Sequence, residues 1–199
     1  MEYLLSESSL YISSQIVSKK VLTPEISQIS VHAPLVAAKA KAGQFIILRV
    51  DENGERIPLT ISSADQENGT ITVIFQKVGA TTMALDQLQE GDCLHDFVGP
   101  LGEPTHGEGY GRVAVLGGGL GCAIALPVAK ALHEAGNQVD LIGGFKTKDI
   151  VILEEEMGQD LAAAADPADW IARMRARLRA RVPADNDNNT AAAVWLRQK

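Results

Sequence analysis

A glycine-rich run that follows a short apolar segment constrains this chain more than any other feature. Residues 113–116 are apolar, four glycines follow within residues 117–121, and a helix-like segment extends to about Ala135. This order predicts a buried strand, a tight turn and a helix. Glycine lets a backbone approach a pyrophosphate closely, and a helix N-terminus offers free N–H groups to it. The run therefore predicts a dinucleotide site; the simpler alternative is a tight strand-to-helix turn without a ligand. The four glycines are Gly117, Gly118, Gly119 and Gly121.

The composition is that of a folded globular chain. The sequence has 199 residues and is 46% hydrophobic, which is enough for one domain or one and a half. A net charge of -7 gives no reason to expect nucleic acid as a partner. We expect no membrane span, and the first residues lack the features of a secretory signal, so a cytoplasmic location is expected. Two cysteines, Cys93 and Cys122, are too few for a four-cysteine iron–sulfur cluster, and no metal site is predicted.

Residues 1–102 have the pattern of a small β-rich domain. Short apolar segments alternate with turn residues, and a short helix is expected over 81–88. This spacing predicts a six-stranded antiparallel barrel or sandwich. The expected strands cover residues 9–21, 25–31, 43–50, 57–63, 70–78 and 92–98, and the last is closed by the turn 99–102.

The pattern changes after a linker at 103–111. Strands at 112–117 and 138–143 alternate with helices at 121–136 and 149–157, which predicts parallel strands in a partial nucleotide-binding domain over 103–157. Pro127 is expected to kink the first of these helices. Residues 158–199 form a tail rich in arginine and alanine, predicted to be helical at 167–182 and then disordered.

Two further segments have residues suited to binding phosphate. Arg56 can contact a phosphate, Pro58 suits an edge strand or bulge, and the Thr60 hydroxyl can bind a ligand atom. The alternatives are a surface arginine, a turn proline and a threonine chosen for its β propensity. Farther along, Gly79 and Thr81 open a short helix whose N-terminus suits phosphate oxygens, or at which Thr81 serves only as the N-cap.

Taken in order, these segments resemble the ferredoxin–NADP reductase superfamily. The resemblance is greatest to the group with the electron-transfer subunit of dihydroorotate dehydrogenase and the small subunit of NADH-dependent ferredoxin:NADP oxidoreductase, also known as sulfide dehydrogenase. It covers about residues 10–157. The residues that carry it are Arg56 to Thr60, Gly79 to Leu85, Gly99 to Gly102, Gly117 to Leu132 and Gly143 to Asp149.

The resemblance implies an FAD-binding barrel followed by an NAD(P)-binding domain. By analogy, Arg56 holds the FAD pyrophosphate, and Thr60 approaches the flavin N5 as the catalytic residue, with Pro58 and Leu59 also at the cofactor. The turn formed by Gly79, Thr81 and Thr82 would bind the other side of the pyrophosphate. The glycines of 117–121 would receive the pyrophosphate of NAD(P). The implied activity is electron transfer between NAD(P)H and a ferredoxin or a large flavoprotein or iron–sulfur subunit.

The chain also departs from the family pattern. The superfamily motif Arg-x-Tyr-Ser has an aromatic residue that is absent here, and Thr60 lies one residue further on. Cys122 stands where many relatives have proline, which makes it a buried filler or a nicotinamide contact. The cysteines that hold a [2Fe–2S] cluster in this group do not follow Met157.

These departures lead us to expect a truncated oxidoreductase. The tail would be a product of a frameshift or truncated gene, a cover for the open sheet edge, or a basic helix on a membrane surface. The alternatives for the whole chain are a non-catalytic module that binds FAD or a partner, and a nonfunctional fragment.

Overall fold

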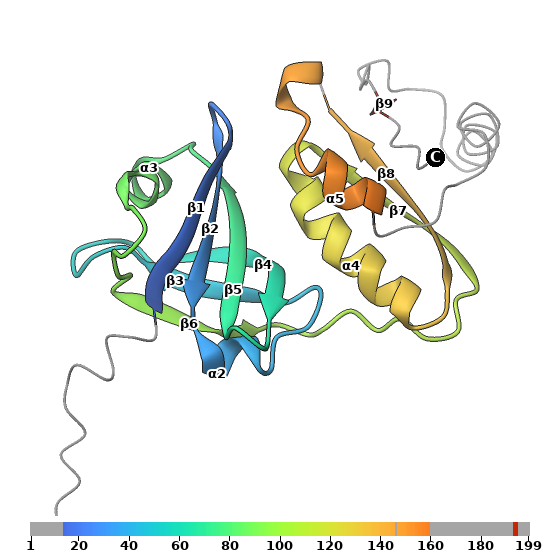
Figure 1. Cartoon of the computed structure of the whole chain (residues 1–199), viewed down its shortest axis with the longest axis horizontal. Helices are drawn as coiled ribbons and strands as arrows, with labels where there is room; N and C mark the ends of the chain where they lie inside the picture. Colours follow the sequence, from blue (N-terminus) through green and yellow to red (C-terminus); the bar gives the residue numbers. More distant parts are fainter. Residues whose placement is uncertain (1–13, 146, 160–192, 195–199) are drawn as a thin grey trace, which may run out of the picture.

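The computed structural model describes residues 14–145, 147–159 and 193–194. An antiparallel β-sheet unit and an αβ unit lie side by side, and the segment between β6 and β7 connects them (Figure 1). The tail helix and the disordered stretch that we predicted for 167–199 lie outside the described residues, apart from 193–194. Within the described part of the chain, no helix is long and apolar enough to cross a membrane.

The first unit is the predicted six-stranded antiparallel sheet. Its strands are β1 (Gln15–Thr23), β2 (Ile26–His32), β3 (Phe45–Arg49), β4 (Ile57–Asp65), β5 (Thr70–Gln76) and β6 (Asp96–Leu101). They pair in the order β1-β2-β5-β4-β3-β6. A bridge between Gln15 and Cys93 ties β1 to the segment before β6, so the sheet curls into a barrel.

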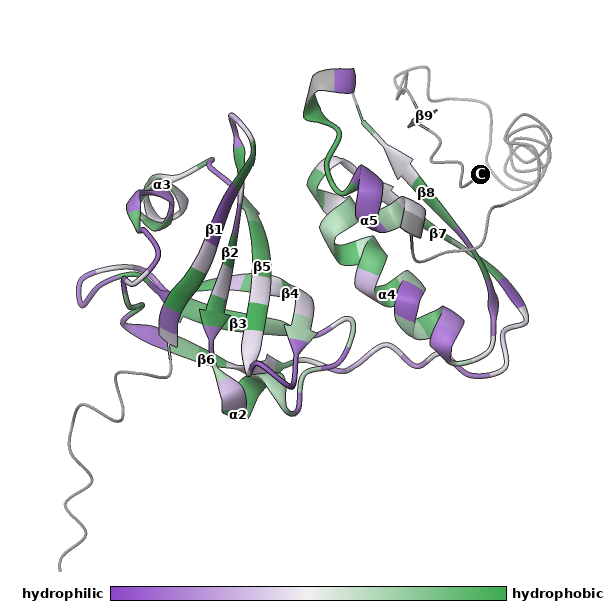
Figure 2. Ribbon diagram, in the orientation of Figure 1, coloured by the Kyte–Doolittle hydropathy of each residue, from purple (hydrophilic) through white to green (hydrophobic). Residues whose placement is uncertain are grey.

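The barrel core follows from the period-2 alternation of its strands. Ile29, Val31, Ile71, Val73 and Phe75 are at most 1% exposed. Because alternate residues of a strand point to opposite faces, these side chains meet inside the curled sheet. Figure 2 shows the resulting hydrophobic stretches along the barrel strands and along α4 (Cys122–Glu134).

The sixth strand differs from the prediction. We expected it at 92–98, with a turn at 99–102, but β6 begins at Asp96 and continues through Gly99 and Pro100 to Leu101. Its only partner strand among the described residues is β3, with a register shift between Phe45 and Ile47. A strand at a sheet edge tolerates a proline because one row of its backbone groups makes no ladder hydrogen bonds.

Two helices accompany the barrel. α3 (Ala80–Gln87) is the predicted short helix, and its Leu85 is fully buried against the core. α2 (Pro34–Ala37) was not predicted from the sequence. It is a single turn that starts with a proline at its first position, where the missing N–H leaves no hydrogen bond unmade.

The second unit has the predicted parallel strands. β7 (Arg112–Gly118) pairs in parallel with β8 (Gln138–Gly144), and α4 packs against both. A 3₁₀ turn, η2 (Gly119–Gly121), connects β7 to α4. α4 is continuous through Pro127. The predicted helix at 149–157 is instead a 3₁₀ turn, η3 (Lys148–Ile150), followed by α5 (Glu154–Gln159), while β9 (Ala193–Val194) pairs antiparallel with β8.

The two units share an apolar contact that fixes their relative position. Ile26 and Ile74 of the barrel pack in one cluster with Cys122, Leu126 and Phe145 of the αβ unit, and all five are at most 6% exposed. The N-terminal turn of α4 is therefore held close to β2 and β5.

One buried side chain also holds the connecting segment in place. The Asn137 carboxamide accepts a hydrogen bond from Tyr110 N at 3.0 Å, and donates to Leu132 O at 2.7 Å and to Gly107 O. A buried amide with its hydrogen bonds satisfied fixes local geometry, because leaving any of them unmade is costly. The connection between the units is thus tied to the C-terminal end of α4.

Candidate functional site

The outer face of β4 has two of the predicted cofactor contacts, Pro58 and Thr60. Ile57, Leu59 and Ile61 turn their side chains toward the barrel core. The intervening residues, Pro58 and Thr60, are therefore on the opposite face. Leu59 was predicted to contact the cofactor, but its side chain packs against the core, so only its backbone faces the site.

Each half of β4 has only one partner strand in the described structure. The ladder with β3 covers Ile57 to Thr60, and the ladder with β5 begins at Ile61. We predicted an edge strand or a bulge from Pro58; β4 is internal in the strand order, but within the described residues its first half has a free edge. Proline is acceptable there because no second ladder needs its N–H. A flat ligand could lie along the backbone at this edge.

Arg56 is exposed and bound to a carboxylate. Its side chain is 61% exposed, and Nη2 donates a hydrogen bond to Asp96 Oδ2 at 2.8 Å. Asp96 also has Arg49 Nε at 2.8 Å and His95 Nδ1 at 3.1 Å. The hydrogen bond with the His95 ring, followed by the contacts with Arg49 and Arg56, lowers the pKa of Asp96, and burial opposes them. Asp96 therefore remains a carboxylate at neutral pH.

At the start of α3, Thr82 rather than Thr81 makes the cap contacts. Gly79 is the N-cap residue. Thr82 Oγ1 accepts hydrogen bonds from the backbone N–H groups of Val78 and Gly79, both at 3.1 Å, and donates to Gly79 O at 3.0 Å. The alternative in which Thr81 serves only as the N-cap does not hold, because the turn is closed by Thr82 from inside the helix. The N–H groups of the first turn of α3 have no carbonyl partner within the helix and remain available to an acceptor.

The glycine-rich turn has two kinds of glycine. A Cβ on Gly117 would lie 2.8 Å from Cys122 Cα and 3.0 Å from Ala125 Cβ, so glycine here lets α4 pack closely on β7. A Cβ on Gly118, Gly119 or Gly121 would meet no atom of the described residues within 4 Å. The backbone of these three is open to a ligand, and Gly119 has a φ of +52°, which favours glycine.

The first residue of α4, Cys122, is fully buried in the cluster between the two units. Burial raises the pKa of its thiol, with a smaller opposing effect from a hydrogen bond to the Gly144 backbone. A protonated, inaccessible thiol behaves as a small apolar side chain. These properties favour the buried-filler interpretation over a nicotinamide contact.

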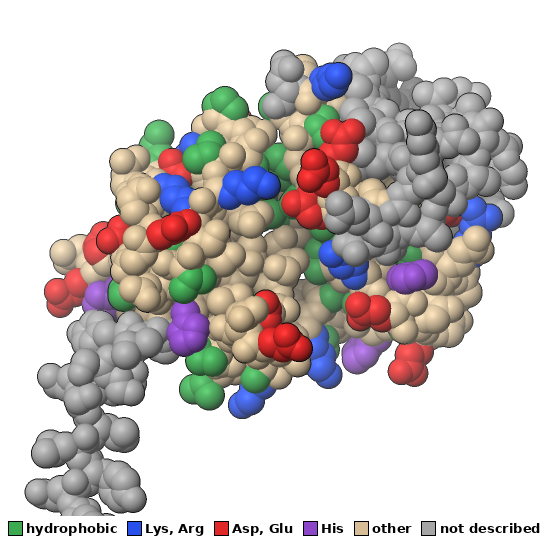
Figure 3. Space-filling model, viewed as in Figure 1, with side chains coloured by type: hydrophobic (Ala, Val, Ile, Leu, Met, Phe, Trp, Pro, Cys, Tyr) green, Lys and Arg blue, Asp and Glu red, His purple; other side chains and the backbone are tan. Residues whose placement is uncertain are grey.

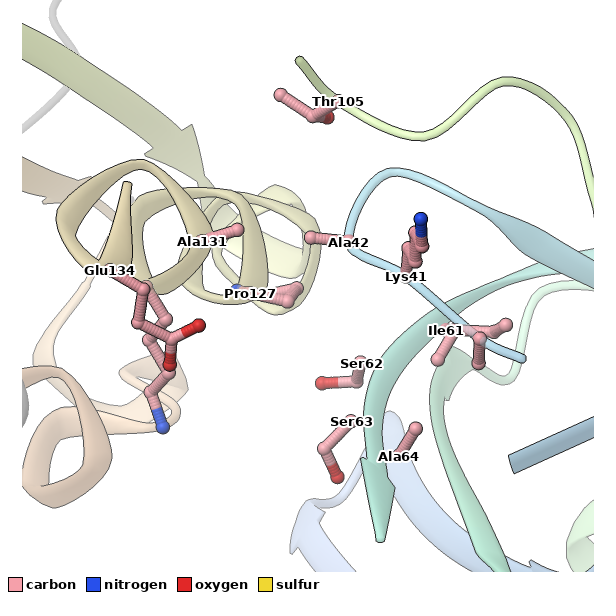
Figure 4. A pocket seen from close by; sticks show the side chains of 12 residues that line it. Lys41, Ala42, Ile61, Ser62, Ser63, Ala64, Thr105, Pro127, Ala131 and Glu134 are labelled. Carbon is pink, nitrogen blue, oxygen red and sulfur yellow. The ribbon is translucent and has the colours of Figure 1, made fainter. Parts of the chain in front are cut away.

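A crevice of about 500 Å³ separates β4 from α4. Ser62 and Ser63 lie on one wall, with Pro127, Ala131 and Glu134 facing them from α4 (Figure 4). Among the described residues, Arg56, Thr60 and Thr82 do not line this crevice, so it does not unite the predicted site residues. The lining residues are Ala40, Lys41, Ala42, Ile61, Ser62, Ser63, Ala64, Thr105, Pro127, Lys130, Ala131 and Glu134.

Basic side chains do not gather into one patch on the face of the molecule shown in Figure 3. On the face shown in Figure 3, lysines and arginines are interspersed with aspartates and glutamates. The charge pattern therefore offers no basic stripe for nucleic acid on this face. Within the described residues, no group of histidine, cysteine or acidic side chains is arranged to hold a metal ion.

The sequence and the fold define the class of protein. Residues 13–106 match the family model of the oxidoreductase FAD-binding domain. Residues 13–106 thus form an FAD-binding oxidoreductase domain of the ferredoxin reductase-like type, and the resemblance derived from the sequence is confirmed.

Several relatives indicate the subgroup. The chain is 42% identical over 143 residues to the homolog of the dihydroorotate dehydrogenase B (NAD(+)) electron transfer subunit from Thermotoga maritima, covering 72% of this chain and 51% of that protein. It is 36% identical over 150 residues to the dihydroorotate dehydrogenase B (NAD(+)) electron transfer subunit of Streptococcus pneumoniae, covering 73% of this chain and 58% of that subunit. The chain therefore spans about half the length of these curated relatives.

Solved structures agree with this assignment. The NADH-dependent reduced ferredoxin-NADP oxidoreductase, solved in a study of flavin-based electron bifurcation, has a TM-score of 0.73 and 37% identity, covering 84% of this chain and 64% of that one. Phthalate dioxygenase reductase has a TM-score of 0.65 at 17% identity, covering 86% and 65%, and is similar in fold. The predicted fold, a β-barrel followed by a parallel αβ unit, is confirmed.

Proposed function

We propose that this chain binds FAD on the outer face of β4. The diphosphate would lie between Arg56 and the first turn of α3, and the flavin ring along the free edge of β4 beside Pro58 and Thr60. The single observation that carries this proposal is the half-paired β4, whose exposed backbone edge and outward Thr60 follow directly after an exposed arginine.

The residues present fit such a cofactor. Arg56 has five N–H donors, of which one makes a hydrogen bond within the described structure. In the part of the chain that the structure describes, a Cβ on Gly79 would meet no atom within 4 Å, so a phosphate can approach the backbone there. Unpaired N–H groups at a helix N-terminus and an arginine together are suited to a doubly charged diphosphate.

The open turn at Gly118, Gly119 and Gly121 would receive the diphosphate of NAD(P). FAD, when bound, supplies the chemistry that connects two-electron hydride transfer with one-electron steps. The protein residues bind and orient: Arg56 holds the diphosphate, Thr60 offers its hydroxyl to the flavin N5, and the backbone of 57–60 supports the ring. The acceptor would be a ferredoxin or a larger flavoprotein or iron–sulfur subunit, as the relatives' names as electron transfer subunits suggest.

The proposal includes a cytoplasmic location. Cys93 and Cys122 are both free thiols. Free thiols are typical of a reducing compartment, where disulfides rarely persist.

Absorbance tests the FAD assignment. The purified protein, incubated with FAD and then desalted, should retain a flavin absorbance band at about 450 nm. Arg56→Ala should weaken FAD binding by about tenfold or more, because a charge-assisted contact to the diphosphate is lost. A matched control, Arg112→Ala, removes an arginine whose ion pair is with Asp140 of β8 and not with a residue of β4 or β6; a thermal melt establishes that the control is folded. A wild-type protein that takes up no FAD would refute the proposal.

A second candidate is a module that binds FAD without reacting with NAD(P)H. It is favoured by the extent of the family match, which ends at residue 106, before the glycine-rich turn. Anaerobic addition of NADH or NADPH distinguishes the two. Bleaching of the flavin band supports the reductase, and retention of a coloured, unbleached flavin supports the module.

A further inference from the structure

Three charged side chains form a row across one end of the barrel sheet. Strand pairing places Leu48 opposite Ile57, and Arg49 opposite Asp96. Arg56, the residue before β4, is thus brought beside this pair. The register of three adjacent strands sets the row, so its geometry is fixed by the core.

Each side-chain nitrogen of the inner member of the row, Arg49, lies within 3.0 Å of a polar atom. Nη1 donates to Glu52 O at 3.0 Å, Nη2 lies 2.9 Å from His95 Nδ1, and Nε forms an ion pair with Asp96 Oδ2 at 2.8 Å without hydrogen-bond alignment. Its side chain is only 18% exposed. Arg49 is therefore a fixed positive charge that holds the Asp96 carboxylate in place.

The outer member, Arg56, has one anchoring contact among the described residues. Its Nη2 contacts the Asp96 oxygen that Arg49 also holds, and the side chain is 61% exposed. An arginine side chain loses considerable rotamer entropy when it is immobilised. Asp96 restricts the guanidinium before any anion arrives, while the remaining N–H donors stay accessible.

We propose that Asp96 is a positioning residue for diphosphate binding: it orients the Arg56 guanidinium toward the anion, and Arg49 in turn fixes Asp96. This inference rests on the proposed FAD function. Asp96 itself does not touch the ligand. Because two arginines surround one carboxylate, the row keeps a net positive charge. Pre-organisation of this kind raises affinity by reducing the ordering that binding requires.

If Asp96 instead competed with the ligand for Arg56, removing Asp96 would change FAD affinity in the opposite direction. A carboxylate that merely competed with the diphosphate for Arg56 would weaken binding, so its removal would increase FAD affinity. The direction of the change therefore separates positioning from competition.

A double-mutant cycle with FAD tests the inference. We expect Asp96→Ala to weaken FAD binding about tenfold when Arg56 is present and less than about twofold in an Arg56→Ala background. Asp96→Asn keeps an acceptor oxygen, so its FAD affinity should lie between those of the wild type and of Asp96→Ala. The matched control is Asp65→Asn, which alters a carboxylate at the other end of β4 that is bonded to Asn68 and should leave FAD affinity unchanged.

Three outcomes would overturn the inference: a gain in affinity, an unchanged affinity, or an equal loss in both backgrounds. The last would mean that Asp96 acts only through the fold. Thermal melts of each variant establish whether it is folded. If Asp96→Ala does not fold, Asp96→Asn takes its place in the cycle.

A titration of the FAD-free protein with inorganic pyrophosphate separates this inference from the flavin assignment. If the wild type takes up no FAD but binds pyrophosphate, and this binding falls with Asp96→Ala only when Arg56 is present, the inference stands and the flavin assignment fails. If pyrophosphate binding does not depend on Asp96, the inference fails even where FAD binds.

Discussion

The barrel and the αβ unit differ in how their sheet edges are closed. In the barrel, the bridge from Gln15 to Cys93 joins the two ends of the strand order. In the αβ unit, β7 has β8 on one side and no strand on the other among the described residues, and Leu116 is 57% exposed. The N-terminal part of α4 packs in one apolar cluster with the barrel residues Ile26 and Ile74. The barrel is therefore the frame of the molecule, and the αβ unit depends on it.

The largest effect on stability is expected from a substitution in the barrel core. Phe75 is 1% exposed in the barrel core, so Phe75→Ala should destabilise the protein by about 3–5 kcal/mol. Thermal melts followed by circular dichroism should show both units unfolding at lower temperature, and FAD should be lost with them.

The matched change in the other unit is Leu132→Ala. Leu132 is 7% exposed in a small cluster with Ala129 and Val139. Its loss should loosen the αβ unit while FAD stays on the barrel. The frame model is wrong if Leu132→Ala releases FAD as completely as Phe75→Ala does.

A smaller effect tests the contact between α4 and β7. Gly117→Ala places a Cβ 2.8 Å from the Cys122 backbone, which should cost up to about 3 kcal/mol of stability as α4 moves. Gly118→Ala is the matched control, because its Cβ enters open space and should change stability by less than about 0.5 kcal/mol. Equal melting temperatures for the two variants would contradict the packing role of Gly117.

A third prediction concerns the polar contacts that hold α3 on the barrel. Asp86 Oδ1 accepts a hydrogen bond from the buried Ser27 hydroxyl at 2.5 Å, and Lys77 Nζ is 3.3 Å from Oδ2. Asp86→Ala should cost about 1–2 kcal/mol, because Ser27 loses its partner. Denaturant titration measures this loss.

Asp86 also makes stability depend on pH. Burial raises its pKa, but Ser27, Lys77 and Lys19 together outweigh burial, and the net pKa lies below the usual value of 3.8. Stability from this lowered pKa is fully present above the unfolded-state pKa and is lost as pH falls through the folded-state value. Asp86→Asn should flatten that part of the pH profile, whereas Glu67→Gln, at an exposed residue, should not.

The smallest expected effect involves the two cysteines. Cys93 is exposed and Cys122 is buried, so a thiol reagent should modify Cys93 alone in the native protein. Mass spectrometry of peptides measures the labelling at each site. Rapid modification of Cys122 would show that the contact between the two units opens readily in solution.

Local patterns predicted much of the fold. Alternation in β2 and β5, the turn at 65–69, and the change to a βαβ pattern after residue 111 are all encoded in neighbouring residues, and the structure has each of them. The end of β6 was missed because Gly99 and Pro100 are typical of turns, and only the pairing with β3 makes them part of a strand.

The site was less accessible from the sequence. Arg56, Pro58 and Thr60 were predicted from type and spacing, and the structure places them at the free half of β4 or directly before it. Arg49 and Asp96 were missed, because their proximity depends on a strand order that pairs β3 with both β4 and β6. An arginine ending one predicted strand and an aspartate within another were the only available signals.

The half-paired β4 has a consequence for how this surface tolerates substitution. Where a ligand is recognised by main-chain atoms, exchanging one side chain for another of similar shape leaves the recognition intact. A change that bends or shifts the chain, such as an insertion between Ile57 and Thr60, would displace every such atom at once. Saturation mutagenesis of residues 57–60 should therefore find many substitutions that preserve FAD binding, whereas insertions and deletions in the same segment should abolish it.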